Sequence, residues 1–348
     1  MRSILRFATA VAASLALGVP LSGSLHAEEL AKNLFGSMKL PAVAARPQSI
    51  GFYSKGCFVG GVELPDDGAN WQSMRLSRNR HWGLPVTINM IEKLARDAAA
   101  KDGWPGLMVG DISQPRGGPM RDGHASHQIG LDVDIWFTPM PNRRLSISER
   151  ETIKQVSMIK RGGLTVNDKV WTDSRMRLLR RAASYPEVER ILVHPGIKKK
   201  LCETVTGDRS WLRKVRPFWG HDEHFHVRIG CQPGSPLCKE QAAPPPGDGC
   251  DGKALAWWFT AEPWRPAKNP DAPKARDVMT LKALPKECRA VLALPAPGET
   301  GNTAVATVLP DADTDAAPAA ATPESMGINA FAPTPDIGVP LPRDRPPG

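Results

Sequence analysis

The sequence predicts an α+β domain built on a small central antiparallel sheet, flanked by helices and by loops that disulfides hold together. Three observations lead to this fold class. Apolar residues recur at helical spacing in some segments and alternate with polar ones in others. The chain contains six cysteines, and five of its eight histidines fall in two short clusters.

The first predicted helix covers residues 85–100. Its apolar side chains recur every three or four positions and so share one face: Ile88, Ile91, Leu94, Ala95 and Ala98. Pro85 suits the first turn, where its missing N–H costs no hydrogen bond. The apolar run at 107–112 then predicts a strand.

Two later segments alternate in the way that a strand with one apolar face requires. In 130–137 the apolar face holds Leu131, Val133, Ile135 and Phe137, and the other face holds Asp132, Asp134 and Trp136. In 224–229 the apolar Phe225, Val227 and Ile229 oppose His224, His226 and Arg228. Between these strands we expect a helix at 173–184, a strand at 189–194 and a further helix near 208–212.

The two ends of the chain do not belong to the predicted domain. Residues 1–27 have the pattern of a secretory signal, with Arg2 and Arg6 before an apolar run that is too short to span a bilayer. Residues 295–348 are rich in proline and acidic residues, and Phe331 is their one aromatic side chain, so we expect a disordered tail. This leaves 28–294 as one exported domain, expected in the periplasm without stable membrane insertion.

Charge indicates the kind of partner. The whole chain carries +9, of which residues 1–27 hold +2 and residues 295–348 hold −5, so the domain itself carries +12. Such a surface favours a polyanion. Because the chain is expected to be exported, an envelope polymer with carboxylates or phosphates is favoured over nucleic acid. No basic segment interleaved with stacking aromatics supports nucleic-acid binding.

The even number of cysteines predicts three disulfides in an exported protein, with 15 possible connectivities. Cys231 and Cys238 bracket a loop rich in proline and glycine, which favours a local bridge between them. A zinc cluster of cysteines is disfavoured because no pair has C-x-x-C spacing.

The histidine clusters predict that the central sheet carries a metal site. If the strands at 130–137 and 224–229 are neighbours, Asp134, His226 and His224 project from the same face. His127, in the loop that enters the first strand, can bend over it. One carboxylate and two imidazoles suit Zn²⁺ and leave a fourth position for water.

The same strand face offers a catalytic base. His224 lies two residues from His226, where it can take a proton from a metal-activated water during attack on a carbonyl. Asp132 either orients a ligand imidazole or is simply solvated.

These residues resemble a known family. The segments 123–134 (GHASHQIGLDVD) and 221–228 (HDEHFHVR) are similar to those of the penicillin-insensitive murein endopeptidases, and the resemblance runs from about Lys39 to Leu292. It implies a zinc enzyme that hydrolyses D-alanyl-meso-diaminopimelyl cross-bridges in peptidoglycan. It also implies disulfides 57–288, 202–250 and 231–238.

The resemblance assigns roles to six residues, which are matched motif by motif. His127, Asp134 and His226 would be the zinc ligands, and His124 a further ligand or a close neighbour of the metal. His224 would be the catalytic base, and His221 would help to bind or stabilise the tetrahedral intermediate.

Two departures from the family pattern stand out. Some members build an additional metal site at a subunit interface from an Asp-x-x-His motif, and residues 161–165 here lack both residues. A metal-bridged dimer is therefore not expected, and the sequence leaves the oligomeric state open. The acidic tail is an addition to which we assign no role.

Two other classes compete with a metallopeptidase. Ser157-Met158-Ile159-Lys160 matches the S-x-x-K motif of penicillin-binding serine enzymes, but S-D-N and K-T-G are absent from the sequence. A non-catalytic module that binds peptidoglycan through a retained zinc would have no need of His224 beside the ligands.

Overall fold

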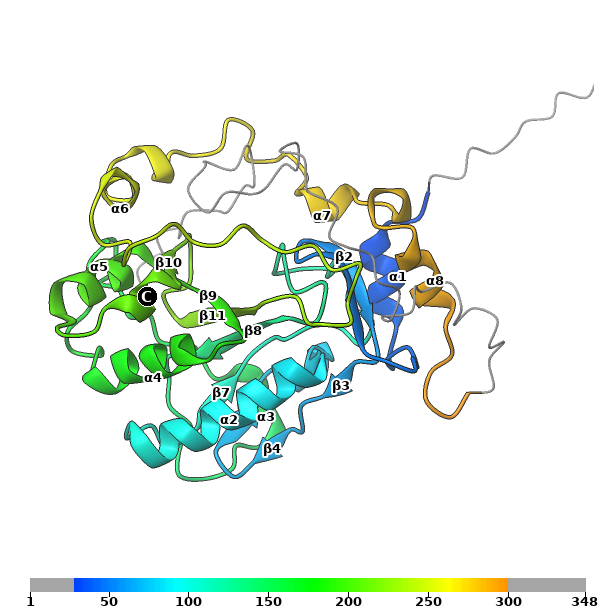
Figure 1. The fold of residues 1–348 in the computed structure, drawn as a ribbon, viewed down its shortest axis with the longest axis horizontal. Coiled ribbons are helices and arrows are strands. Elements are labelled where there is room, and N and C mark those ends of the chain that lie inside the picture. The colour runs from blue at the N-terminus through cyan, green and yellow to red at the C-terminus, as the bar shows by residue number, and fades with distance from the viewer. Residues whose placement is uncertain (1–27, 300–348) are drawn as a thin grey trace, which may run out of the picture.

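The computed structural model describes residues 28–299, so the predicted signal at 1–27 and most of the predicted tail lie outside the described residues. Its main feature is a seven-stranded sheet with the strand order β10-β9-β11-β8-β7-β5-β4 (Figure 1). These strands are β4 Asp67–Gly68, β5 Trp71–Ser73, β7 Leu107–Val109, β8 Asp132–Trp136, β9 Val188–Val193, β10 Val215–Pro217 and β11 His224–Ile229.

Two small sheets and eight α-helices complete the described part of the chain. The small sheets pair β1 Gln48–Phe52 with β2 Lys55–Val59, and β3 Val62–Glu63 with β6 Trp82–Gly83. The helices are α1 Ala31–Ser37, α2 Pro85–Lys101, α3 Ile147–Thr152, α4 Asp173–Ser184, α5 Pro195–Thr204, α6 Lys253–Trp257, α7 Ala275–Val278 and α8 Glu287–Ala293. Single 3₁₀ turns lie at Leu76–Arg78, Ser210–Arg213, Glu262–Trp264 and Leu281–Ala283.

The α+β class is confirmed, and the long periodic segments fold as their patterns predict. Helices α2 and α4 and strand β11 cover the expected segments almost to the residue, and β7, β8 and β9 lie within a few residues of theirs. The helix expected near 208–212 is a single 3₁₀ turn.

The central sheet is larger than predicted and is not purely antiparallel. β9 pairs with β10, and β5 with β7, in parallel. The additional strands β4, β5 and β10 have only two or three residues each, which is too short for alternation to be read from the sequence.

The central strands are buried on both faces. On one face, Val133 and Ile135 of β8 pack in the same core as Leu94 of α2 and Leu178 of α4. On the other face, Asp132 and Asp134 are also buried, at 0% and 4% exposed. The predicted polar face of this strand is therefore a protein interior, where each charged group needs a partner.

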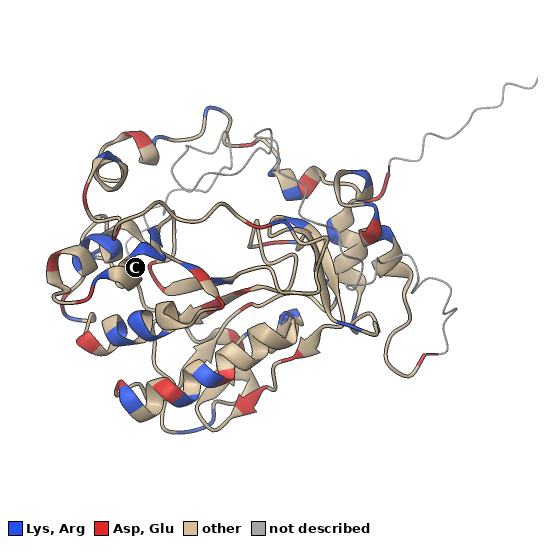
Figure 2. Cartoon of the chain, viewed as in Figure 1, with Lys and Arg blue, Asp and Glu red and all other residues tan. Residues whose placement is uncertain are grey.

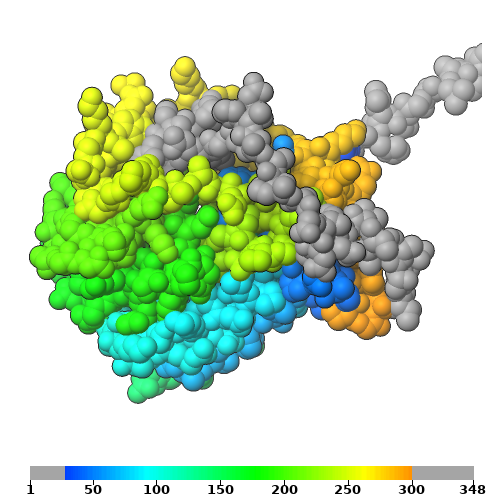
Figure 3. Space-filling model, in the orientation of Figure 1, coloured from blue at the N-terminus to red at the C-terminus, as the bar shows by residue number. Residues whose placement is uncertain are grey.

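Disulfides attach the outer segments, and their pairing is the one that the resemblance implies: Cys57–Cys288, Cys202–Cys250 and Cys231–Cys238. The first joins α8 to β2 within a second core formed by α1, β1, β2 and α8, at the right of Figure 1. The second joins α5 to the loop before α6, and this part of the chain is drawn in yellow at the upper left of Figure 3.

Basic residues are frequent on α4 and α5, where they are marked in blue at the left of Figure 2. Those on α4 are Arg175, Arg177, Arg180 and Arg181, and those on α5 are Lys198, Lys199 and Lys200. Among residues 28–299, no helix has the length and apolar character needed to cross a membrane.

Candidate metal centre and active site

The site is built on the pairing of β8 with β11. The two strands are antiparallel neighbours, and their register places His226 directly opposite Asp134. Opposite residues on paired strands project from the same face of a sheet. As a result, Nδ1 of His226 lies 3.1 Å from Oδ1 of Asp134, as the alternation of both segments predicted.

The loop before β8 bends back over this pair. His127 has a φ of 67°, in the left-handed region that few residues other than glycine adopt. Its backbone N–H donates to Oδ2 of Asp132 at 3.0 Å, and its carbonyl accepts from the hydroxyl of Ser113. These two bonds hold a strained backbone conformation of the kind that clusters at functional sites.

The ring of His127 is fixed with its free nitrogen toward the site. Nδ1 donates to the carbonyl of Ile112 at 2.6 Å, so Nε2 of the neutral ring carries no proton. That Nε2 is buried, has no hydrogen-bond partner among the described residues and lies 3.5 Å from Oδ1 of Asp134. A buried acceptor without a donor is costly, and a cation at this position would satisfy it.

The contact between His226 and Asp134 also favours a bound cation. Nε2 of His226 lies 3.0 Å from Oδ1 of Asp132, which leaves the unprotonated Nδ1 of the neutral ring facing the carboxylate of Asp134. Two acceptors at 3.1 Å repel each other unless a proton or a cation lies between them. The donor set therefore fits a metal ion.

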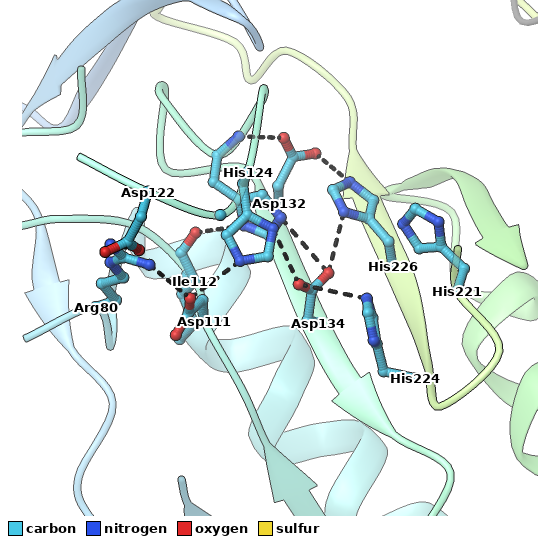
Figure 4. A network of polar contacts seen from close by, with 12 residues as sticks. Arg80, Asp111, Ile112, Asp122, His124, Asp132, Asp134, His221, His224 and His226 are labelled. Atoms are coloured by element: carbon cyan, nitrogen blue, oxygen red, sulfur yellow. Dashed lines mark hydrogen bonds and ion pairs between the residues drawn. The ribbon is translucent and has the colours of Figure 1, made fainter. Parts of the chain in front are cut away.

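Three further histidines surround Asp134 (Figure 4). Nδ1 of His124 and Nε2 of His224 lie 3.4 and 3.6 Å from Oδ2 of Asp134, and both side chains are 23% exposed. His221, with a φ of 56°, donates from Nδ1 to the carbonyl of Trp219 at 2.7 Å. Its ring centroid lies 5.8 Å from that of His226.

All six residues singled out by the sequence thus meet in one place, and two sets of them could hold a metal ion. One set is His124, His127 and Asp134, and the other is Asp134, His221 and His226; within each, the ligand atoms lie within 4.8 Å of one another. Imidazole nitrogens with a carboxylate oxygen are ligands that zinc prefers.

The pKa values of Asp134 and His224 both lie below the ordinary values of these groups. Burial raises the pKa of Asp134, but His224, His127 and His124 outweigh it, so the pKa lies well below its usual range. Burial lowers the pKa of His224 more than the charge of Asp134 raises it. A neutral imidazole with partial solvent access can act as a base.

The pKa values of His221 and His226 are shifted in opposite directions. Burial, with the neighbouring His224 and His226, places the pKa of His221 well below its usual range. Burial also lowers the pKa of His226, but Asp132 and Asp134 outweigh it and the net shift is upward. In the metal-free protein a second proton on His226 can therefore take the place of the cation.

Groups that the sequence did not indicate hold His124 and its loop in place. Oδ2 of Asp111 accepts from Nε2 of His124 at 3.0 Å and from guanidinium N–H groups of Arg80 and Arg78 at 3.0 and 3.1 Å. The signal available was an acid within the apolar run at 107–112. Arg276 on α7 donates to the carbonyls of Gly123 and His124, a contact that no local pattern reveals.

The chain is similar to known proteins over most of its length. A family model described as penicillin-insensitive murein endopeptidase matches residues 49–293. Proteins named penicillin-insensitive murein endopeptidase from Haemophilus influenzae and Yersinia enterocolitica are 41% and 40% identical, over 68% and 72% of this chain and 80% and 87% of their own lengths. One from Pectobacterium atrosepticum is 39% identical over 80% of this chain and 94% of its own length.

Proposed function

Because the chain belongs to the penicillin-insensitive murein endopeptidase family and is a peptidase that hydrolyses peptidoglycan, we propose that it is a zinc enzyme that cleaves D-alanyl-meso-diaminopimelyl cross-bridges. The observation that carries the proposal is the cluster of imidazole nitrogens around the buried carboxylate of Asp134. Nε2 of His127 has no partner there, and Nδ1 of His226 faces the carboxylate at 3.1 Å.

His127, Asp134 and His226 would hold the zinc, with His124 as a further ligand or a close neighbour. When bound, zinc would polarise the scissile carbonyl and make water a stronger nucleophile near neutral pH. Asp134 is ionised, and the His127 and His226 rings are each fixed by a hydrogen bond on the opposite nitrogen. Little reorganisation of the chain is then needed to bind a cation.

His224 would be the general base. Burial lowers its pKa and so favours the neutral ring, and its side chain is 23% exposed, which gives water access to the imidazole. Nε2 would accept a proton from the attacking water and pass it to the leaving amine of the diaminopimelyl residue. His221 would contact the substrate beside His224. Its Nδ1 hydrogen is donated to the carbonyl of Trp219, so the neutral ring presents Nε2 as an acceptor. It could donate to the tetrahedral intermediate only after taking up a proton.

The net charge of the domain agrees with this substrate. Stem peptides of peptidoglycan carry free carboxylates, which the basic domain of residues 28–294 would attract. We place the enzyme in the periplasm, exported by residues 1–27, with 295–348 as a tail outside the catalytic domain. The absence of an Asp-x-x-His motif at 161–165 argues against a metal-bridged dimer.

One digestion tests the reaction, the bond and the metal together. Purified protein is incubated with cross-linked muropeptide dimers, with and without a chelator or penicillin, and the products are weighed by mass spectrometry. We expect each dimer to take up one water and yield two monomers with a new D-alanyl carboxyl terminus and a freed diaminopimelyl amine. Zinc, added back after chelation, should restore the activity, and penicillin should leave it unchanged. Cleavage that persists in chelator, or at another bond, would contradict the proposal.

A further inference from the structure

Asp132 is a buried carboxylate that the proposed reaction does not use. It is 0% exposed and accepts four hydrogen bonds from three residues. Oδ1 accepts from Nε2 of His226 at 3.0 Å and from Nε of Arg228 at 2.8 Å. Oδ2 accepts from the backbone N–H of His127 at 3.0 Å and from Nη2 of Arg228 at 3.2 Å. Both oxygens therefore face donors alone, an arrangement that only an ionised carboxylate satisfies.

These contacts fix two of the proposed metal ligands, His226 and His127. The bond to His226 places that ring's hydrogen on Nε2, so its Nδ1 lone pair is directed at Asp134. The bond to the backbone of His127 holds the left-handed turn that directs this ring into the site. One carboxylate thus connects a ligand on the entry loop with a ligand on β11.

Arg228 holds the carboxylate in turn. Its guanidinium contacts both oxygens of Asp132, lies over the ring of Tyr53 at 4.0 Å, and donates to Oε1 of Gln241 at 2.7 Å. A planar guanidinium bound at two atoms and stacked on a ring fixes orientation as well as charge. Arg228 is itself 6% exposed, so it has little freedom to leave this position.

We propose that Asp132, held by Arg228, is a positioning residue that sets the zinc affinity of the site by fixing His127 and His226 as ligands. The inference rests on the proposed function in one respect only, that these two histidines bind zinc. Neither Asp132 nor Arg228 touches the substrate in this assignment.

Asp132→Asn is the direct test, because it preserves shape and replaces one acceptor oxygen by an NH₂ group. Whichever way the amide turns, that group meets an N–H donor of His226, His127 or Arg228. We expect zinc affinity, measured by competition with a chromophoric chelator, to fall roughly 10- to 100-fold. In the NMR spectrum of zinc-loaded Asp132→Asn, the Nε2–H resonance of His226 should be shifted or absent relative to the zinc-loaded wild type.

Arg228 supplies a second test that stands even if Asp132→Asn does not fold. Arg228→Gln should weaken zinc binding by roughly tenfold, and Arg228→Lys, which keeps the charge but not the two-atom contact, should recover part of the loss. Arg190→Gln is the matched control. Arg190 lies opposite Arg228 on β9 and is 3% exposed, but it donates to the carbonyl of Ala242. Its loss should leave zinc affinity unchanged, whatever it does to the melting temperature.

The outcomes separate this inference from the proposed function. Wild-type zinc affinity and an unmoved His226 resonance in folded Asp132→Asn and Arg228→Gln would overturn the positioning role and leave the zinc peptidase intact. An equal loss of zinc affinity in Arg190→Gln would overturn it too, since general damage to the core would then explain the effect. A wild-type protein that binds no zinc would overturn both.

Discussion

His226 and Asp134 are 92 positions apart in the chain, yet Nδ1 of the first lies 3.1 Å from Oδ1 of the second. The contact follows from the register of β11 against β8, in which the two residues are direct partners. Both side chains are almost fully buried. The buried acceptors gathered here are unfavourable without a proton or a cation between them, and this pair lies at the centre of the candidate metal site.

Removal of either member of this pair should remove metal and activity together. In Asp134→Ala and His226→Ala we expect the purified protein to lose stoichiometric zinc, measured by elemental analysis. The hydrolysis rate should fall at least about 1,000-fold, because the metal supplies several kcal/mol of transition-state stabilisation. Asp168→Ala is the matched control: this carboxylate is 63% exposed and pairs with Lys200 on the surface. Retention of zinc by both site variants would contradict the ligand assignment.

Replacement of His224 should separate binding from catalysis. His224→Ala removes the proposed base but none of the three proposed ligands, so zinc content should stay at the wild-type level. Turnover of muropeptide dimers should drop by roughly 10²–10⁴, the usual contribution of general acid–base catalysis. Full activity in this variant would show that another group moves the proton.

His194 should make stability depend on pH. Its Nδ1 accepts from the backbone N–H of Gly196 at 3.0 Å and so caps α5, and its ring stacks on Trp264. Burial lowers its pKa from 6.5 to about 4, although Asp222 opposes the shift. The unfolded chain therefore binds the proton more readily, and the stability that neutral His194 contributes is complete above pH 6.5 and is lost as the pH falls toward 4.

The variant His194→Asn isolates this effect, because asparagine caps a helix well and does not titrate. Between pH 7 and pH 4, the wild type should lose about 2–3 kcal/mol more unfolding free energy than His194→Asn, measured by denaturant titration. Parallel pH profiles for the two proteins would show that His194 is protonated in the folded state as easily as in the unfolded one.

The disulfides should differ in what they contribute to stability. Cys57 and Cys288 are 231 positions apart, whereas Cys231 and Cys238 are separated by 7. Closure of a long loop removes more entropy from the unfolded chain, by about 3 kcal/mol for these two loop lengths. Unfolding in urea should therefore show a larger loss for Cys57→Ala/Cys288→Ala than for Cys231→Ala/Cys238→Ala. Equal losses would contradict this entropic account.

Local patterns predicted the elements that are long and strongly periodic. α2, α4, β8 and β11 each show a clear helical or alternating repeat, and each forms within a few residues of its expected range. Strands of two or three residues, such as β4 and β10, show no repeat. The sequence therefore predicted a small antiparallel sheet, whereas the structure has a sheet of seven strands that pair in both directions. The parallel pairings of β5 with β7 and of β10 with β9 also join segments that are distant in the chain.

By itself the sequence determined which residues gather at the candidate site, because two histidine clusters on alternating strands can converge on one face of a sheet. It left open whether Asp132 is solvated or orients an imidazole, and it did not mark Asp111 or Arg276. Only the tertiary structure decided these points. Residues far along the chain hold the site: Arg228 donates to the carboxylate of Asp132, and Arg276 donates to the backbone carbonyl of His124. Such partners are brought together by packing, which no local spacing encodes.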